Sequence, residues 1–283
     1  MGEISGMSVH FRKVEAADDA QQVVGKSAIE QLRRSVWSDA PITRVEADTL
    51  FLANDQLRGG DPEWGVFFTE ALVEYLVDAG ARAGHIDDSR ARWLKARILF
   101  DGRIAERDEL EVLLRALERA HSAPGWLRNL ALEEVEQAVI QGSGCTRPDN
   151  NTPAGSINAG EVKSLRRILF AHGGPAISRA DVEVLFRIKA ATLHGDNDPS
   201  WEALFVDSTA AYLLGFGGIY NLSDERSGEL EDFLTHTGAA IGDFLNRAMR
   251  MAIAESDLYG LLEADETLDP LEKTLVAFLA SRH

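Results

Sequence analysis

The segments SLRRILF (164–170), ISRADVEVLF (177–186) and DPSWEALFVDSTAAYLL (198–214) decide the fold, because the same three phrases occur twice more, earlier in the chain. An earlier copy reads WLKARILF (93–100), IAERDELEVLL (104–114) and APGWLRNLALEEV (123–135). The first copy reads QLRRSVW (31–37), ITRVEADTLF (42–51) and DPEWGVFFTEALVEYL (61–76). Recurrence of one phrase in a fixed order predicts that each copy is one structural unit, repeated along the chain.

The apolar residues of each copy follow a helical period. In the third copy, Val184, Leu185 and Ile188 recur at spacings of three and four, which places them on one face of a helix. Sustained alternation of apolar and polar residues, which would indicate strands, is not found. We therefore predict an all-α fold, built as an array of three imperfect three-helix repeats.

The end of the chain repeats the start of a helix once more. Asp269-Pro270 opens an apolar segment that continues to Leu279, and this partial fourth copy predicts a C-terminal helical cap over the last repeat. The predicted organisation is an N-terminal arm or extra helix (1–26), repeats one and two (27–141), a loop or linker (142–156), and repeat three with the C-terminal helices (157–283).

Several helix starts carry capping signals. Thr43 and Ser178 are each followed three residues later by an acid, Glu46 or Asp181, the spacing of a reciprocal capping box. Asp198-Pro199 places an acid at the N-cap and a proline at the first helical position, where the missing N–H costs no helical hydrogen bond.

The same acids are also candidate metal ligands. Glu46 and Glu70 occupy the repeat positions of Asp181 and Asp207. If the second and third helices of a copy pack antiparallel, each pair could present hard oxygen ligands to a divalent cation such as calcium or magnesium. The competing interpretation is that Glu46 and Asp181 cap their helices, while Glu70 and Asp207 are solvated.

The phrase Asp101-Gly102-Arg103-Ile104, followed by the acids Asp108 and Glu109, resembles the tellurite-resistance protein B (TerB)-like helical domain, with degenerate versions around Ile42 and Ile177. The resemblance would cover most of residues 27–283, although two copies lack the Asp-Gly pair. It implies an all-helical bundle linked to stress or metal response, with clustered acids able to bind a metal and no catalytic reaction.

Composition narrows the classes of partner and location. The formal net charge is −17, a field that repels phosphate backbones, so we expect no nucleic-acid partner. The first residues lack the apolar region of a signal peptide, and no apolar run approaches the length of a membrane span. We expect a cytoplasmic protein with no membrane span.

The single cysteine, Cys145, excludes an internal disulfide. It lies in a loop-like segment with no neighbouring base, so we expect an inert, exposed thiol.

No catalytic pattern competes with a binding role. The chain lacks a G-x-S-x-G elbow, a P-loop, and the histidine motifs of zinc or di-iron helices. We predict a non-enzymatic helical scaffold or protein-interaction module, linked to stress response, with a protein partner and no certain cofactor. The alternative is a divalent-cation-binding or sensing protein that uses helix-borne carboxylates. An enzyme whose acids assemble only in the fold, and an acidic mimic of nucleic acid, are the other hypotheses.

Overall fold

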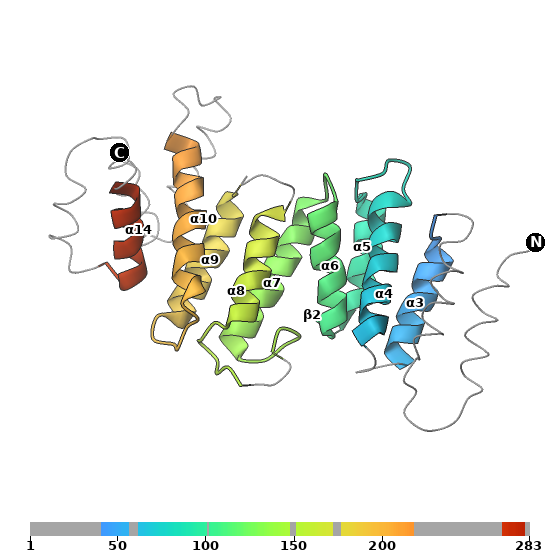
Figure 1. Cartoon of the computed structure of the whole chain (residues 1–283), viewed down its shortest axis with the longest axis horizontal. Helices are drawn as coiled ribbons and strands as arrows, with labels where there is room; N and C mark the ends of the chain where they lie inside the picture. Colours follow the sequence, from blue (N-terminus) through green and yellow to red (C-terminus); the bar gives the residue numbers. More distant parts are fainter. Residues whose placement is uncertain are drawn as a thin grey trace, which may run out of the picture. The chain divides into compact units, whose positions relative to one another are not determined.

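The computed structural model describes residues 41–56, 62–100, 102–147, 151–171, 177–217 and 268–280. About 70% of these residues are helical, which confirms the all-α prediction (Figure 1). The α-helices of the described ranges are α3 (Arg44–Gln56), α4 (Pro62–Val73), α5 (Asp88–Ile98), α6 (Arg107–Arg119), α7 (Gly125–Gln141), α8 (Ala159–Leu169), α9 (Arg179–Thr192), α10 (Ser200–Gly217) and α14 (Pro270–Ala280).

The chain divides into two compact units. Unit 1 comprises residues 1–134 and 144–148, and unit 2 comprises residues 135–143 and 149–283. The division falls within α7, so its first part belongs to unit 1 and its last part to unit 2. The predicted N-terminal arm, the first helix of copy one and the part of the predicted C-terminal helices that falls in 218–267 lie outside the described residues.

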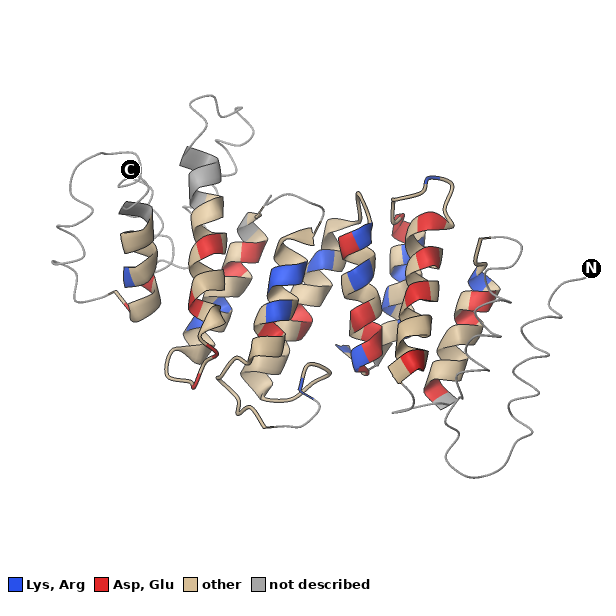
Figure 2. Cartoon of the chain, viewed as in Figure 1, with Lys and Arg blue, Asp and Glu red and all other residues tan. Residues whose placement is uncertain are grey.

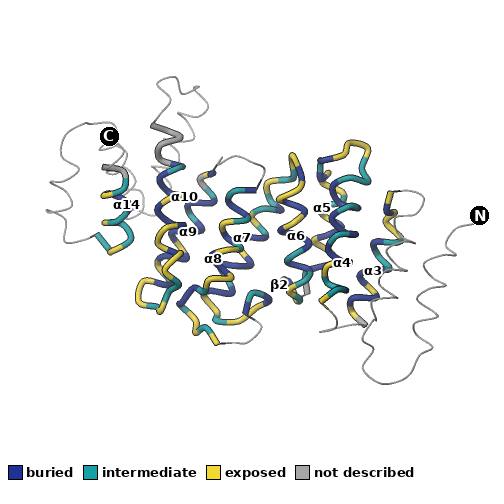
Figure 3. The backbone as a smooth tube through the Cα atoms, viewed as in Figure 1, coloured by how far each residue is buried: buried dark blue, intermediate teal, exposed yellow. Residues whose placement is uncertain are grey.

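Aromatic rings form the core of unit 1. Phe51 meets Phe68 and Trp93 edge-on, with ring centroids 5.2 and 5.6 Å apart, and Tyr75 meets Trp93 at 4.8 Å. Trp64 is 3% exposed, and its indole N–H donates to Asn54 Oδ1 at 2.9 Å. Buried and exposed residues alternate along α3 and α6 (Figure 3), as the helical period of the apolar residues requires.

Two features of unit 1 depart from a purely α-helical reading. The helix α4 continues directly into a π-helix, η1 (Glu74–Asp78). After α5, the two-residue strands β1 (Leu99–Phe100) and β2 (Arg103–Ile104) pair antiparallel as a hairpin. Gly102 has a φ of 82° at its turn, a conformation that favours glycine. Strands of two residues are too short to show alternation, so the sequence indicated only a turn here.

In unit 2, α10 packs against α8, α9 and α14. Trp201 and Phe205 of α10 and Phe186 of α9 are buried together, with ring centroids 5.2 Å apart for Phe186 and Phe205. The predicted cap at Asp198 is present, because its carboxylate accepts the N–H of Ser200 at 2.9 Å.

Reciprocal capping boxes start five of the described helices. At α3, Thr43 N donates to Glu46 Oε2 at 2.8 Å, and Glu46 N donates to Thr43 Oγ1 at 3.3 Å. The other pairs are Glu106–Glu109 at α6, Asn158–Glu161 at α8, Ser178–Asp181 at α9 and Asp269–Glu272 at α14. The capping predictions for α3 and α9 are thus confirmed. In the second copy Glu109, rather than Asp108, occupies the capping position.

The box at α8 gives a direct measure of what one cap contributes. Asn158 Oδ1 accepts the N–H of Glu161 at 2.9 Å, and Glu161 is fully buried. Replacing Asn158 with Ala removes that acceptor, so we expect N158A to lower the free energy of unfolding by about 0.5–2 kcal/mol. Denaturant titration measures the loss. The exposed Lys163→Ala change in the same helix is the control, and an equal effect of both variants would contradict the capping role.

Candidate functional site

The four predicted metal ligands lie in two different settings. Glu46 and Asp181 close capping boxes, and Asp181 is only 1% exposed. Glu70 is half-buried on α4, and Asp207 is exposed on α10. Glu46 and Asp181 therefore act as helix caps, as their position three residues after Thr43 and Ser178 predicts.

The capping contacts occupy oxygens that a cation would need. Glu46 Oε2 accepts both the N–H and the hydroxyl of Thr43 at 2.8 Å, and Asp181 Oδ2 accepts the same two groups of Ser178 at 2.7 and 2.8 Å. Within the described ranges, no group of three or more His, Cys, Asp or Glu side chains is arranged to hold a metal ion. The assignment of Glu46, Glu70, Asp181 and Asp207 as ligands stays a prediction.

A buried carboxylate, Glu134, contacts the β1–β2 hairpin of unit 1. Glu134 of α7 is 3% exposed and accepts from Arg103 Nε at 3.1 Å and Arg103 Nη2 at 2.8 Å. Its second oxygen accepts the backbone N–H of Ile104 at 3.1 Å. A buried carboxylate needs such partners to remain charged, so Glu134 anchors the hairpin to α7.

Sequence reasoning missed Glu134. Its neighbour Glu133 is exposed, and nothing in the run LEEVEQ distinguishes the two acids. Only the apolar period offered a signal, since Glu134 lies three residues after the buried Ala131 and four before the buried Ala138, on the inward side of the helix.

Cys145 belongs to the same cluster. Its Sγ lies 3.9 Å from Glu134 Oε1, and the residue is 8% exposed. The prediction of an exposed thiol is therefore wrong, because the loop after α7 folds back onto unit 1. Burial first, and the nearby Glu134 charge second, raise the pKa of Cys145 to about 12. The thiol stays protonated at neutral pH, which agrees with the expected lack of reactivity.

Glu109 is the group of this region that exchanges a proton near neutrality. It is 5% exposed and accepts the backbone N–H of Glu106 at 3.1 Å. Burial raises its pKa to about 7, and the negative charges of Glu106 and Asp55 act in the same direction. Carboxyl groups with a raised pKa mark functional sites in many proteins, although the pKa of a buried structural acid is also often raised.

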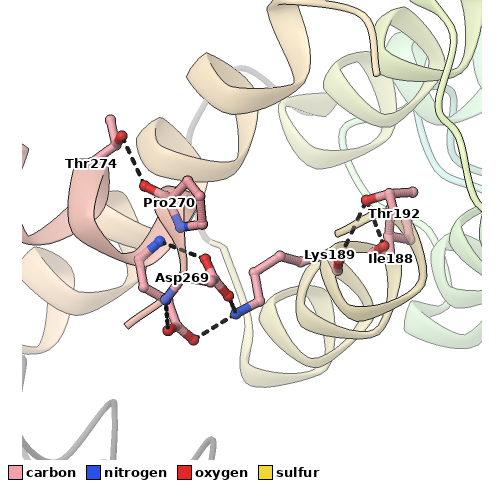
Figure 4. A network of polar contacts seen from close by, with 7 residues as sticks. Ile188, Lys189, Thr192, Asp269, Pro270 and Thr274 are labelled. Atoms are coloured by element: carbon pink, nitrogen blue, oxygen red, sulfur yellow. Dashed lines mark hydrogen bonds and ion pairs between the residues drawn. The ribbon is translucent and has the colours of Figure 1, made fainter. Parts of the chain in front are cut away.

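Unit 2 contains a second polar network, drawn in Figure 4. Lys189 of α9 pairs with Asp269 and, at 2.5 Å, with Glu272 Oε1 at the start of α14. The lysine side chain is 8% exposed, and those of Asp269 and Glu272 are 17% and 14% exposed. Because the same two acids also form the capping box of α14, one lysine fixes both the start of α14 and its position against α9.

Charges elsewhere are spread over the helices. Figure 2 shows Asp and Glu on most helices of each unit, with Lys and Arg between them. Some of these charges pair between helices of one unit, such as Arg97 with Asp48 at 2.7 Å and Arg187 with Glu136 at 2.6 Å. This distribution differs from the single charged face expected of a nucleic-acid mimic.

No family model, curated protein or solved structure matches this chain. The TerB-like resemblance therefore stays a prediction that rests on the residues around Gly102. In the part of the chain that the structure describes, no helix is both long and apolar enough to cross a membrane.

We predict that Glu109 makes stability depend on pH. Its folded pKa is about 7 against an ordinary 4.5, so between these values the folded state holds a proton that the unfolded state has lost. The stability that this proton contributes is complete below about pH 4.5 and is lost as the pH rises through 7. Glu109→Gln keeps an acceptor for the Glu106 N–H without the charge.

The free energy of unfolding of E109Q relative to the unchanged protein should therefore rise between pH 4.5 and pH 8, by at most about 3 kcal/mol. Denaturant titrations at a series of pH values measure this difference. Glu118→Gln, an exposed acid of the same helix, is the control. A difference that does not vary with pH would show that Glu109 ionises normally.

The buried thiol of Cys145 gives a prediction about reactivity. With a pKa of about 12 instead of 9.0, the native protein carries roughly a thousandfold less thiolate at pH 8, and the thiolate is the reactive form. Ellman's reagent should label the native chain slowly and the chain in guanidinium completely. Because Cys145 is the only cysteine, rapid labelling of the native protein would show that the thiol is accessible.

Proposed function

We propose that this chain is a non-enzymatic helical scaffold that binds a protein partner, in a stress response as the TerB-like resemblance implies. The observation that carries the proposal is that the acids best suited to catalysis or metal binding make structural contacts instead. Glu46, Asp181 and Glu109 close helix starts, and Glu134 anchors the hairpin. Side chains committed to such contacts hold helices in place rather than act on a substrate.

The repeat architecture belongs to this proposal. The triplets α5–α6–α7 and α8–α9–α10 follow the same order, and the middle helix of each starts with a capping box. Repeats of this kind bury their apolar faces against their neighbours and leave an extended surface for binding. In the first copy, α3 and α4 correspond to the second and third helices of these triplets.

An apolar surface in unit 1 is where we expect the partner to bind. Val45 and Leu52 lie two turns apart on α3 and are each 60% exposed, and Val66 of α4 is 47% exposed. The helices α3 and α4 contact each other. The spacing of seven residues places Val45 and Leu52 on one face of α3, and we propose that this face, with Val66 of the adjoining helix, forms an apolar interaction surface.

Affinity capture with a surface variant tests the proposal. The full chain should recover a reproducible partner from stressed cells, and the double change Val45→Glu and Leu52→Glu should abolish that recovery, because charges replace the apolar contact. Ile140→Glu, at a residue 41% exposed on α7, is the matched control and should leave recovery unchanged. Circular dichroism checks that all three proteins stay folded. Equal recovery by the double variant and the control would contradict the proposed surface.

The alternative function is binding or sensing of a divalent cation through Glu46, Glu70, Asp181 and Asp207. It requires Glu46 and Asp181 to share or release the oxygens that now accept from Thr43 and Ser178. Cation binding would therefore compete with helix capping.

A further inference from the structure

Two histidines lie together where the loop after η1 meets the loop between α6 and α7. The backbone N–H of His121 donates to Gly84 O at 2.7 Å, and that of Ile86 donates to Ser122 O at 3.0 Å. These bonds tie His85 and Ser122 into an isolated parallel bridge. The bridge fixes the backbone from which the two rings project, while the side chains themselves can still rotate.

Gly84 allows the close approach of the two loops. Its φ is 80°, and a Cβ at this position would overlap Nδ1 of His121. The imidazole of His121 therefore lies directly against the Gly84 backbone, beside the residue that carries the second ring. Any other residue at 84 would both strain the backbone and displace His121.

The two rings are near enough to share one ion. The centroids of His85 and His121 are 6.2 Å apart, and the ring planes are inclined by 39°. With metal–nitrogen bonds of about 2.0–2.1 Å, each ring centroid lies roughly 3 Å from the metal, so two rings on one ion are separated by about 5–6 Å. Tetrahedral coordination requires the rings to move about 1 Å closer and both Nε2 atoms to turn toward the ion, a movement of the size that side-chain rotation provides.

One ring nitrogen of His85 is engaged, since its Nδ1 lies 2.6 Å from Ser122 Oγ. Nδ1 of His121 is packed against the Gly84 backbone, where a Cβ would overlap it. Nε2 is therefore the nitrogen of each ring that we assign to the metal. A hydrogen bond to the other ring nitrogen is the usual way in which proteins fix the orientation of a metal-binding histidine, and Ser122 supplies that bond for His85.

The neighbouring backbone is also unusual. The loop follows the π-helix η1 directly, and short π-helices are often found at functional sites. At the other loop, α6 ends at Arg119, which pairs with Glu74 and Asp78 of η1 at 3.4 and 2.5 Å. The ion pairs hold the end of α6, and hence His121, close to the element that leads into His85.

We propose that His85 and His121 form a surface site for a nitrogen-preferring transition-metal ion, with zinc as the probe. Imidazole suits zinc, nickel and copper better than calcium or magnesium, so this site is distinct from the carboxylate alternative above. The two rings supply the protein ligands, and water or an incoming ligand completes the coordination. The net charge of −17 favours cation binding in general, whereas Arg82 exerts a positive field on His85 and weakens it.

Calorimetric titration of the full chain with zinc chloride at pH 7.5 tests the site. We expect one zinc ion per chain, with affinity at least tenfold lower in His85→Ala and in His121→Ala. His194→Ala, at an exposed histidine of unit 2, is the matched control and should bind as the unchanged protein does. Arg82→Ala should bind zinc more tightly, because it removes a like charge from the site.

A conservative variant separates the site from folding. Ser122→Ala keeps both rings and removes only the contact that orients His85, so it should weaken zinc binding less than either histidine change, while the melting temperature without zinc stays constant. The proposal is overturned if zinc binds the unchanged protein no more tightly than His121→Ala. It is equally overturned if His194→Ala loses as much affinity as His85→Ala.

Discussion

The reciprocal capping box is the interaction on which five of the described helices, α3, α6, α8, α9 and α14, depend for their first turn. The first N–H groups of a helix have no partner within it, and in a buried setting each unsatisfied group is costly. At α8 and α9 the acid of the box is buried, since Glu161 is fully buried and Asp181 is 1% exposed. Each carboxylate accepts the backbone N–H of its capping residue, Asn158 or Ser178.

Charged residues also join neighbouring elements, in addition to capping helix starts. Lys189 pairs with both acids of the α14 capping box, and Arg103 pairs with Glu134 where it holds the hairpin. A buried ion pair adds little net stability, because both partners lose water. Removing one partner is costly, however, so such pairs favour one packing arrangement over others. The Lys189 contacts thus join α14 to α9, and the Arg103 contact joins the hairpin to α7, beside the aromatic rings packed in the core of each unit.

Helices and caps could be predicted from the sequence because their signals are local. The three-to-four spacing of Val184, Leu185 and Ile188 and the acid three residues after Ser178 lie within two helical turns. Other features depend on contacts between distant parts of the chain. Glu134 meets Arg103 from 31 residues away, and Lys189 meets Asp269 from 80.

Cys145 shows the same limit. Its glycine-rich surroundings indicated a surface loop, and Ser143 and Gly144 are exposed, yet the Cys145 side chain is buried against Glu134. The register of the second copy was also open between Asp108 and Glu109, and only the hydrogen bond from Glu106 decides it.

The most direct test of acids as structural elements is a thermal melt with and without millimolar calcium, magnesium and manganese. A cation that binds only the folded state must raise the melting temperature. At a concentration of a hundred times its Kd, it adds about 2.7 kcal/mol to the free energy of unfolding. If the carboxylates serve as caps, the melting curves superimpose. A rise with one cation that disappears in Glu70→Gln and Asp207→Asn, which leave the capping boxes intact, would instead show that these acids are metal ligands.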